Sequence, residues 1–421
     1  MAFLRALSAG VSGLRNHQLL MDVIGNNIAN INTIGFKSSR ATFSDLFTQT
    51  LRGATQSIGG NGGSNPIQVG LGTSINTLDT LFTQGNIEST GISTDLAIQG
   101  SGFFIVKKDG QNLFTRVGTF QLDATGKLVN PGTGAVVQGK VADDAGVVPS
   151  GTKLDDIKLS LDKKAPAKAT STVKFSGNLD SAAATGSTFP ASVTIFDSLG
   201  NRINLTMTFT KAAAANSWTW AATAPAPATI TAGGSGTATF KADGSLDTFT
   251  YAGGATALAM TPGTGASALG ITLDVGTPGV FAGVTQSQGT STVSPREQNG
   301  YSYGNLTNIS VDQTGRIIGT FSNGTVITLA QIMLAEFNNP GGLQKVGNNM
   351  YNISGNTGTP GIVTAGESSS STIVSGSLEQ SNVDLADEFT RMITAQRGFQ
   401  SNARVITSSD EFLNEVVNLK R

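Results

Sequence analysis

The sequence is poor in the side chains that most enzymes and metal proteins use. Its 421 residues include no cysteine and a single histidine, His17. Without cysteine the chain cannot form disulfides or thiolate metal sites. A histidine in a chain that has no second imidazole and no thiol is better explained as a packing or surface residue than as a catalytic base or metal ligand. We therefore expect no enzymatic activity, no metal site and no cofactor.

Charge is also scarce. Asp, Glu, Lys and Arg make up 13% of the residues and the formal net charge is -1, whereas soluble domains average about 25% charged residues. Nucleic-acid binding needs a surface rich in lysine and arginine, so we expect no nucleic-acid partner. No apolar run approaches the roughly 18 residues of a membrane-spanning helix, so we also expect no membrane insertion. Arg5 could begin a signal peptide, but Leu7–Leu14 is too interrupted by small residues to form its apolar core.

Three glycine-rich or acidic motifs are better explained as structural elements than as binding sites. Gly100-Ser101-Gly102 superficially resembles a nucleotide-binding loop, but it leads into an apolar strand pattern rather than the start of a helix. The segments 123–126 and 312–315, both of the form Asp-x-Thr-Gly, lack the further carboxylates of a calcium loop. Turn formation explains both of them.

The N-terminal residues carry a helical pattern. Apolar residues recur at alternating steps of three and four, with Gln18 and Gly25 at the missing steps. This pattern predicts a helix from about Leu4 to Ile31 that packs lengthwise against a partner helix. The seam positions are Leu4, Leu7, Val11, Leu14, Met21 and Ile28. The remaining faces are expected to carry the small residues, including Ser8, Gly10, Ser12 and Gly13.

The same pattern returns at the far end of the chain, with Gln396 and Asp410 as polar exceptions. Segments 381–384 and 407–410 both match a capping box, so the first should start this helix, while the sequence leaves open whether the second kinks or restarts it. Both seams are narrow and terminal. We therefore expect the two helices to pair as an antiparallel coiled coil and to pack against neighbouring copies. The C-terminal seam positions are Leu385, Phe389, Met392, Phe399, Ala403, Ile406, Leu413 and Val417.

Between the helices, short alternating segments and turn residues predict strands. One short helical turn is expected within 41–51. The expected fold class is mixed, with mainly β outer domains, a terminal helical coiled coil and nested discontinuous domains. The expected domains are an inner helical domain (1–31 plus 380–421), a connecting segment (32–70), a β-rich middle domain (71–144 plus 285–365) and an inserted β-rich sandwich or barrel (145–284).

Three groups of segments resemble one known family. They are Asn26-Asn27-Ile28-Ala29-Asn30-x-x-Thr33-x-Gly35-Phe36-Lys37, the pair 96–104 and 115–120, and the pair 375–384 and 395–400. These segments resemble the bacterial flagellar axial proteins, a family of rod, hook and hook-associated subunits. The resemblance covers both ends and the 70–140 region, whereas 145–284 resembles nothing specific.

Local physics makes the first motif a helix exit, while the resemblance makes it the join between an inner tube and outer shells. Its residues are expected to act as structural connectors rather than as a ligand site. They are Asn26, Asn27, Ala29, Asn30, Thr33, Gly35, Phe36 and Lys37.

Within the family, hook members fit better than distal-rod members, which are shorter and lack a large inserted β domain. The resemblance implies a flexible helical homopolymer that couples rod to filament and encloses the export channel. It also implies contacts with the distal-rod protein, the hook cap and the hook–filament junction proteins. Export through the flagellar type III apparatus would place the subunit outside the cell, in the hook of the basal body, without a cleaved signal peptide.

A second class of protein remains open at this point. A secreted β-rich adhesin or carbohydrate-binding protein with a coiled-coil stalk would explain the threonine-rich strands and the two tryptophans, Trp218 and Trp220. It would not explain why both terminal helices carry flagellar-type motifs. A tubular polymer would support the hook interpretation, and a discrete monomer or trimer would support the adhesin.

Overall fold

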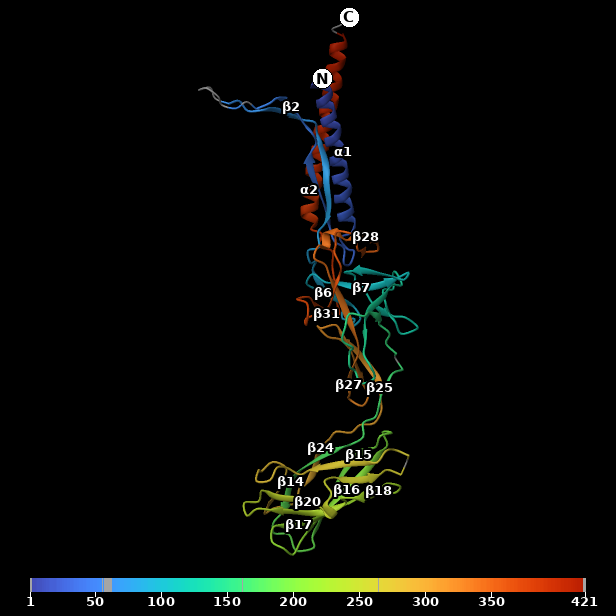
Figure 1. The fold of residues 1–421 in the computed structure, drawn as a ribbon, viewed down its shortest axis with the longest axis vertical. Coiled ribbons are helices and arrows are strands. Elements are labelled where there is room, and N and C mark those ends of the chain that lie inside the picture. Colours follow the sequence, from blue (N-terminus) through green and yellow to red (C-terminus); the bar gives the residue numbers. More distant parts are fainter. Residues whose placement is uncertain (1, 55, 57–62, 161, 264, 419–421) are drawn as a thin grey trace. The chain divides into compact units, whose positions relative to one another are not determined.

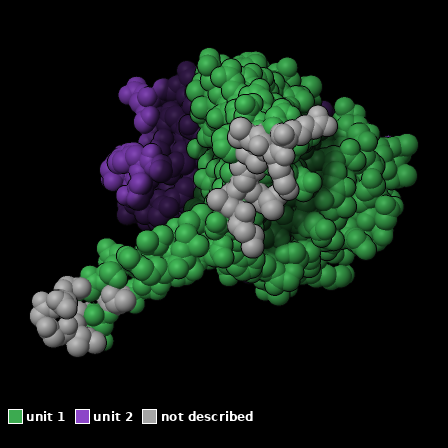
Figure 2. Space-filling model, turned by 90° about the horizontal axis from the view of Figure 1, so that it is seen from above, with its two compact units in different colours: residues 1–160, 309–318, 328–421 green, residues 161–308, 319–327 purple. Residues whose placement is uncertain are grey.

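The computed structural model describes residues 2–54, 56, 63–160, 162–263 and 265–418. Its secondary structure is mainly β with two long terminal helices, which confirms the predicted fold class. The chain forms two compact units, coloured separately in Figure 2. Unit 1 comprises residues 1–160, 309–318 and 328–421, and unit 2 comprises residues 161–308 and 319–327.

The two helices of unit 1 are α1 (Ala2–Ala29) and α2 (Leu385–Asn418), and they lie side by side in opposite directions (Figure 1). Helix α1 ends at Ala29 rather than at the expected Ile31. The N–H of Asn30 donates to the carbonyl of Asn27 (3.1 Å), three residues back, so the α-helical spacing of four has already been lost there.

Helix α2 begins differently from the prediction and then continues without interruption. The carboxylate of Asp384 accepts from the N–H groups of Ala386 (2.8 Å) and Asp387 (3.3 Å), so Asp384 is the N-cap. The predicted capping box with Ser381 as its cap is therefore wrong. The question left open at Thr407 is also answered: its hydroxyl donates to the carbonyl of Arg404 (3.0 Å) within the helix, and α2 continues through this position.

Residues that follow α1 form two narrow antiparallel ribbons instead of the expected helical turn. Strand β1 (Ser39–Asp45) pairs with β4 (Thr73–Thr80), and β2 (Thr48–Arg52) pairs with β3 (Ile67–Gly70). Cross-strand hydroxyl pairs such as Thr42–Thr77 (2.6 Å) stabilise the first ribbon. Pairing with residues some 35 positions away overrides the local apolar spacing that suggested a helix.

The remaining strands of unit 1 are built around one sheet with the order β27-β11-β7-β8-β29-β28. Its aromatic core includes Phe103, Phe114 and Tyr351. Smaller pairs, β31 with β6 and β32 with β5, hold the segment that leads into α2. The bounds are β5 (Ile87–Ser89), β6 (Leu96–Gln99), β7 (Phe103–Lys108), β8 (Gln111–Thr115), β9 (Gln121–Leu122), β10 (Leu128–Val129), β11 (Val136–Val141), β12 (Asp155–Asp156), β27 (Val326–Glu336), η2 (Pro340–Gly342), β28 (Gln344–Gly347), β29 (Met350–Asn352), β30 (Gly361–Thr364), β31 (Thr372–Ser375) and β32 (Ser377–Glu379).

The border between the two units differs from the expected 145–284 insertion at both ends. Residues 145–160 belong to unit 1, because β12 pairs with β11 and the buried Ile157 donates to the carbonyl of Val137 (3.1 Å). Residues 285–308 belong to unit 2, because β23 (Val284–Ser287) and β24 (Ser294–Gln298) both pair with β14 (Thr172–Asp180). Composition alone marked neither border, since strand pairing decides both.

Unit 2 is a sandwich of two sheets around one core. One sheet has the order β15-β16-β17-β19-β20, and the other has the order β18-β21-β22-β14-β23 with β24 on β14. Alternate residues of both sheets point into a core that includes Trp218 and Trp220, each 1% exposed. The further bounds are β13 (Lys164–Ala165), β15 (Thr188–Phe196), β16 (Arg202–Lys211), β17 (Ser217–Thr223), β18 (Thr229–Ala232), β19 (Ser235–Phe240), β20 (Leu246–Tyr251), η1 (Ala252–Gly254), β21 (Leu258–Thr261), β22 (Leu269–Asp274), β25 (Gly304–Val311) and β26 (Arg316–Phe321).

The outward face of the five-stranded sheet carries an uncharged row of hydroxyl groups. In the strand register, one threonine from each strand faces the next, in the order Thr188, Thr210, Thr219, Thr237 and Thr250. The hydroxyls of Thr237 and Thr250 lie 2.7 Å apart. This row follows from strict alternation with the buried residues, which places every second side chain on the outer face.

The two acidic motifs form turns, as the sequence predicts. The carboxylate of Asp312 accepts from the N–H groups of Thr314 (2.9 Å) and Arg316 (2.8 Å) in the turn between β25 and β26. The carboxylate of Asp123 makes the same bonds to Thr125 and Lys127, each at 2.8 Å. The oxygen atoms are therefore used to fix the backbone of the turns.

Candidate assembly site

The end of α1 is tied to both β1 and α2 by one asparagine. Asn27 is 1% exposed, and its amide donates to the carbonyl of Ser39 (2.8 Å) and to the carboxylate of Glu388 (3.0 Å). Its amide oxygen accepts from the N–H of Ser39 (2.9 Å). An asparagine presents both donors and an acceptor in one plane, so no apolar residue could make this set of bonds.

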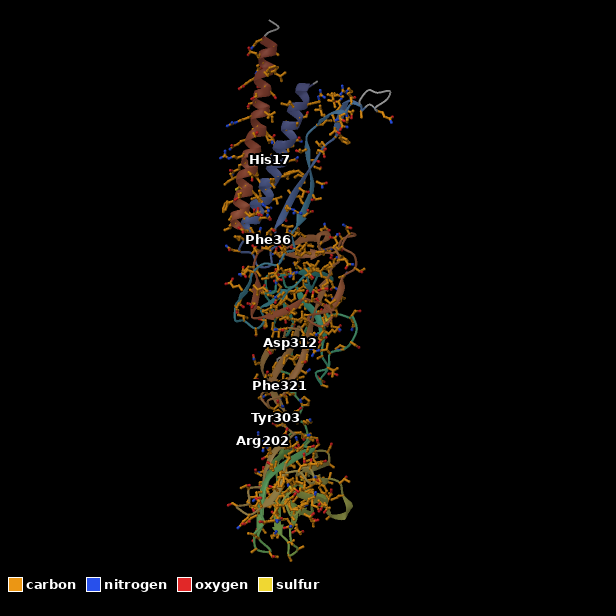
Figure 3. All side chains as sticks on the ribbon, turned by 90° about the vertical axis from the view of Figure 1, so that its left-hand side faces the viewer. His17, Phe36, Arg202, Tyr303, Asp312 and Phe321 are labelled. Carbon is orange, nitrogen blue, oxygen red and sulfur yellow. The ribbon has the colours of Figure 1, made fainter. Side chains whose placement is uncertain are left out.

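The turn after α1 brings the chain against the segment that precedes α2. Gly35 has a φ of +66°, and its N–H donates to the carbonyl of Glu379 (2.8 Å). A β-carbon at this position would lie 3.0 Å from the backbone of Arg116 and of Val117. Glycine is needed here both for the left-handed backbone and for the close approach. Figure 3 labels the neighbouring Phe36 at this passage from the helices to the strands.

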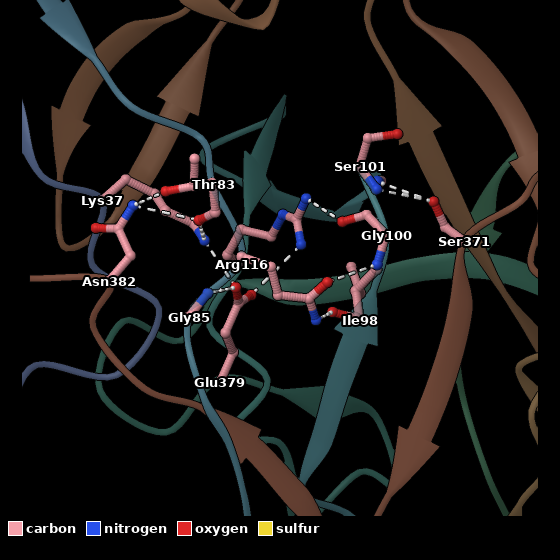
Figure 4. Close-up of polar contacts among 12 residues, drawn as sticks. Lys37, Thr83, Gly85, Ile98, Gly100, Ser101, Arg116, Ser371, Glu379 and Asn382 are labelled. Atoms are coloured by element: carbon pink, nitrogen blue, oxygen red, sulfur yellow. Dashed lines mark hydrogen bonds and ion pairs between the residues drawn. The ribbon is translucent and has the colours of Figure 1, made fainter.

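Lys37, Arg116 and Glu379 form a buried charge cluster (Figure 4). Lys37 Nζ lies 2.7 Å from Glu379 Oε1, and Arg116 Nη1 lies 3.4 Å from Glu379 Oε2. All three side chains are at most 1% exposed. Burial lowers the pKa of Lys37 and of Arg116, while the carboxylate of Glu379 acts in the opposite direction on both.

Backbone groups complete this cluster. Lys37 Nζ also donates to the carbonyl of Thr83 (2.7 Å), Arg116 Nη2 donates to the carbonyl of Gly100 (2.7 Å), and the N–H of Gly85 donates to Glu379 (2.8 Å). The cluster therefore joins segments that lie hundreds of residues apart. Removing one partner from such a buried pair costs about 3–5 kcal/mol, because the remaining charge is left uncompensated.

Asn382 makes a fourth connection between the two ends of the chain. Its amide oxygen accepts from the N–H of Ser38 (2.8 Å), and its amide group donates to the carbonyl of Leu81 (2.9 Å) and to the hydroxyl of Thr83 (2.8 Å). We call Asn27, Lys37, Arg116, Glu379 and Asn382 the polar junction. It links α1, the start of β1, the middle sheet and the segment before α2.

Sequence reasoning singled out only part of this junction. The first motif indicates a connecting role for Asn27 and Lys37, whereas Arg116, Glu379 and Asn382 lie in segments that resemble the family but carry no predicted role of their own. The sequence feature that could have identified Arg116, Glu379 and Asn382 is their charged or amide side chain, because their segments are otherwise apolar or rich in hydroxyl groups. The other asparagines of the first motif make local bonds: Asn30 Nδ2 donates to the carbonyl of Asn26 (2.9 Å), and Thr33 donates to Asn30 (3.1 Å).

The two helices approach each other through small residues, contrary to the prediction that these occupy other faces. A β-carbon on Gly13 would lie 2.7 Å from Asn402, and one on Gly398 would lie 2.5 Å from the ring of His17. Gly10 faces Ile406 at 3.5 Å in the same way. Absence of a side chain lets the helix backbones come close, so Gly10 and Gly13 belong to the helix contact.

The seam residues lie on the helices with different degrees of exposure. On α1, those whose side chains are described are half-buried: Leu7, Val11, Leu14, Met21 and Ile28. Leu4 falls outside the described side chains. On α2 another group is half-buried: Met392, Phe399, Ala403 and Ile406. The remaining members are exposed, at 40% for Leu385, 49% for Phe389, 43% for Leu413 and 65% for Val417. A single chain thus leaves much apolar helix surface in contact with water.

A pocket of about 310 Å³ lies at the junction of α1, β1 and α2. Its walls are mainly apolar and include Leu20, Val23 and Ala395. His17, labelled on α1 in Figure 3, lines it, and so does Glu388 on α2. Among the residues that the structure describes, no group of three or more His, Asp or Glu could hold a metal ion. No described helix is long and apolar enough to cross a membrane.

Family models match four parts of the chain. They are described as flagella basal body rod protein (residues 7–37), flagellar hook protein FlgE/F/G D1 domain (97–171), flagellar basal body protein FlaE D2 domain (160–301) and flagellar basal body rod FlgEFG protein C-terminal (374–419). The third match corrects the expectation that the inserted segment resembles nothing specific. It also falls close to the main segment of unit 2.

Relatives match along the whole chain. The flagellar hook proteins FlgE of Treponema pallidum and Borreliella burgdorferi are each 38% identical, over 99% of this chain and 100% of theirs. The flagellar basal-body rod protein FlgG of Bacillus subtilis is 30% identical over the same shares. On the strength of these full-length matches and the domain models, the chain belongs to the family of bacterial flagellar hook proteins.

Proposed function

We propose that this chain is the structural subunit of the flagellar hook and that it polymerises with copies of itself into a flexible tube. The observation that carries the proposal is the paired terminal helices with their exposed apolar residues. Phe389 and Val417 are 49% and 65% exposed, which is costly for a helix that stays in water. Copies of the same helix pair would bury these residues, and the full-length hook relatives support this role.

In this proposal the seam residues of α1 and α2 hold an inner tube around an export channel. The polar junction then acts as the structural connector between the helix pair and the β domains. Its bonds fix the direction in which the chain leaves α1. Asn27, at the end of the helix, bonds to Ser39 and Glu388. Lys37, just after the helix, bonds to Thr83 and Glu379. Torque would pass from the tube to the outer domains through this connector.

Unit 2 is proposed to form the outer part of the tube and to tune its bending and supercoiling. Neighbouring copies must change their spacing at each revolution without separating. The uncharged threonine row suits such contacts, because hydroxyl groups can both donate and accept and can exchange partners through water. Strong ion pairs would have to break and reform at each turn.

The further partners and the location are part of this proposal, and membership of the family supports them. The distal-rod protein, the hook cap and the hook–filament junction proteins would contact the two ends of the polymer. The subunit would reach the hook, outside the cell, through the flagellar type III export apparatus without a cleaved signal peptide. A structural role of this kind requires no enzymatic activity.

Electron microscopy of the purified protein at high concentration tests the proposal. We expect hollow tubes of regular helical structure. Discrete monomers or trimers under all polymerising conditions would favour the adhesin class instead. A distal-rod role is the second candidate, because a rod protein is also 30% identical over the full length. Expression in a bacterium that lacks its own hook protein separates the two: a hook subunit should restore a curved hook, and a rod subunit should not.

A further inference from the structure

The pocket between α1, β1 and α2 contains a buried carboxylate oxygen without a partner. Glu388 is 5% exposed, and its Oε1 atom accepts from Asn27 (3.0 Å). Its Oε2 atom has no hydrogen-bond partner within the described part of the chain. The nitrogen Nδ1 of His17, which also lines the pocket, is buried and unpartnered among the same residues. Native proteins rarely leave buried polar atoms unpaired, so these atoms point to a missing ligand.

The chemistry of the pocket fits a cation with an apolar stem. The apolar part of the pocket wall includes Leu20, Ile24 and Phe43. Next to these side chains, the Oε2 atom of Glu388 is a charged acceptor without a hydrogen-bond partner among the described residues. An arginine side chain has this form, because its methylene stem packs on apolar surface while its guanidinium donates to a carboxylate. Burial raises the pKa of Glu388 in the single chain, as expected for a carboxylate that lacks its cation.

The cations already at the pocket are engaged elsewhere. Arg40 and Arg391 both line it. Arg40 pairs with Asp79 (3.5 Å) and Arg391 pairs with Asp387 (2.8 Å). Neither makes a bond to Glu388 in the described structure, so the cation must come from another source.

The helix pair itself carries arginines that lack partners. Neither helix contains a lysine, so every cationic side chain on them is an arginine. Arg5 donates to Gln49, and Arg391 is paired as described. Arg15, Arg397 and Arg404 are exposed and make no side-chain hydrogen bond or ion pair within the described residues. Among its described residues, a single chain therefore has a buried carboxylate oxygen on Glu388 that lacks a hydrogen-bond donor. It also has exposed arginine side chains that lack an acceptor.

We propose that the Glu388 pocket receives the guanidinium of Arg15, Arg397 or Arg404 from a second copy of this chain. This inference rests on the proposed function, since it assigns a contact within the polymer. The second copy is favoured because Phe389 and Ile393, one and five residues after Glu388 on α2, are 49% and 56% exposed and also need to be covered. A neighbouring helix pair that covers them would carry its own arginines to the pocket.

Glu388→Gln tests the contact without removing the bond to Asn27, because the glutamine oxygen can still accept from Asn27. Asp387→Asn is the matched control, as it removes a carboxylate one residue away that faces solvent and pairs with Arg391. We expect Glu388→Gln to raise the critical concentration for polymerisation about tenfold or more, the usual effect of losing a hydrogen bond to a charged group. Asp387→Asn should change it by less than about threefold, because exposed pairs contribute little.

Thermal unfolding of the unpolymerised protein separates assembly from folding. Glu388→Gln should leave the unfolding midpoint unchanged or raise it, since it removes a buried uncompensated charge. If Glu388 only stabilises the single chain, Glu388→Gln should instead lower the unfolding midpoint. Assembly should then weaken only as far as this loss of folding stability explains. That result would overturn the inference.

Arginine variants identify the donor. Arg15→Gln, Arg397→Gln and Arg404→Gln are each measured alone and combined with Glu388→Gln. We expect one of the three to weaken assembly as Glu388→Gln does and to add little in the double variant. The inference is overturned if none does so, or if Arg40→Gln or Arg391→Gln does so instead. Wild-type protein that forms no tube would overturn the proposed function as well, whereas normal tubes of Glu388→Gln would overturn this inference alone.

Discussion

The polar junction of unit 1 and the sandwich core of unit 2 hold the chain together in different ways. Unit 2 buries tryptophans and aliphatic residues from two sheets, and its contacts lie within one continuous stretch of strands. The junction instead buries the amides and charges of Asn27, Lys37, Arg116, Glu379 and Asn382, whose partners lie far apart in the sequence. Apolar cores tolerate many substitutions of similar volume. A buried polar cluster tolerates few, because each unpaired group carries a large cost.

This difference implies that unit 2 is replaceable and the junction is not. Removal of the two-sheet sandwich of unit 2 is the largest change that tests the comparison. Lys168 and Tyr301 are joined by two backbone hydrogen bonds of 3.0 Å each, so an Asn-Gly turn can replace residues 169–300 without a gap. We expect the shortened protein to form tubes in electron micrographs, but straight or mechanically altered ones. Loss of all assembly would show that unit 2 is part of the tube's framework.

Glu379→Gln tests the other side of the comparison with a single substitution. It leaves Lys37 and Arg116 buried without a compensating charge, and we expect unit 1 to lose about 3–5 kcal/mol of unfolding free energy. Glu297→Gln is the control, because its pair with Lys174 in unit 2 is exposed and should contribute less than about 1 kcal/mol. Chemical denaturation measures both. Equal losses for the two variants would contradict the special role of the junction.

Leu385→Asp should affect assembly rather than folding, since Leu385 is already 40% exposed in the single chain. If the seam is covered in the polymer, a charge there has no partner and polymerisation should be blocked in a sedimentation assay. Leu199→Asp, at a position that is 57% exposed in a turn of unit 2, is the matched control. We expect this variant to polymerise. If Leu385→Asp still formed normal hooks, the proposal that the seam is covered in the polymer would be refuted.

The smallest expected effect concerns Tyr351, which lies in the core beside the junction. Burial raises its pKa to about 12, with Arg116 acting in the opposite direction. Because the folded pKa is the higher one, its contribution to stability is complete below the unfolded value of about 10 and is lost as the pH rises towards 12. Ultraviolet titration of phenolate formation should show a late step that Tyr351→Phe removes. Titration of all tyrosines near pH 10 would contradict this burial.

The comparison also explains which features the sequence could predict. Local signals predicted the helices and the turns at Asp123 and Asp312, because neighbouring residues make the bonds that fix them. The strand β1 was missed because its partner β4 lies some 35 residues further along the chain, beyond the ribbon of β2 and β3. Glu379 was given no role because its cations lie at positions 37 and 116, and no local pattern links residues that are brought together only by folding.

The contact between the helices was also predicted only in part, because local patterns do not show which residues of two distant segments meet. Periodicity placed α1 against α2, but it could not show that Gly13 and Gly398 allow the closest approach. An apolar pattern indicates which side chains are buried. A glycine has no side chain, so the pattern does not show that it lies at a contact. Whether the leucine seam is covered by other copies is a property of the polymer and not of one chain.

Cryo-electron microscopy of the assembled protein tests the central claim most directly. A helical reconstruction should place α1 and α2 around the central channel, with the seam residues covered by neighbouring copies and unit 2 at larger radius. The polar junction should lie between the two. A reconstruction with the helices on the outer surface, or with Phe389 and Val417 still facing solvent, would contradict the account.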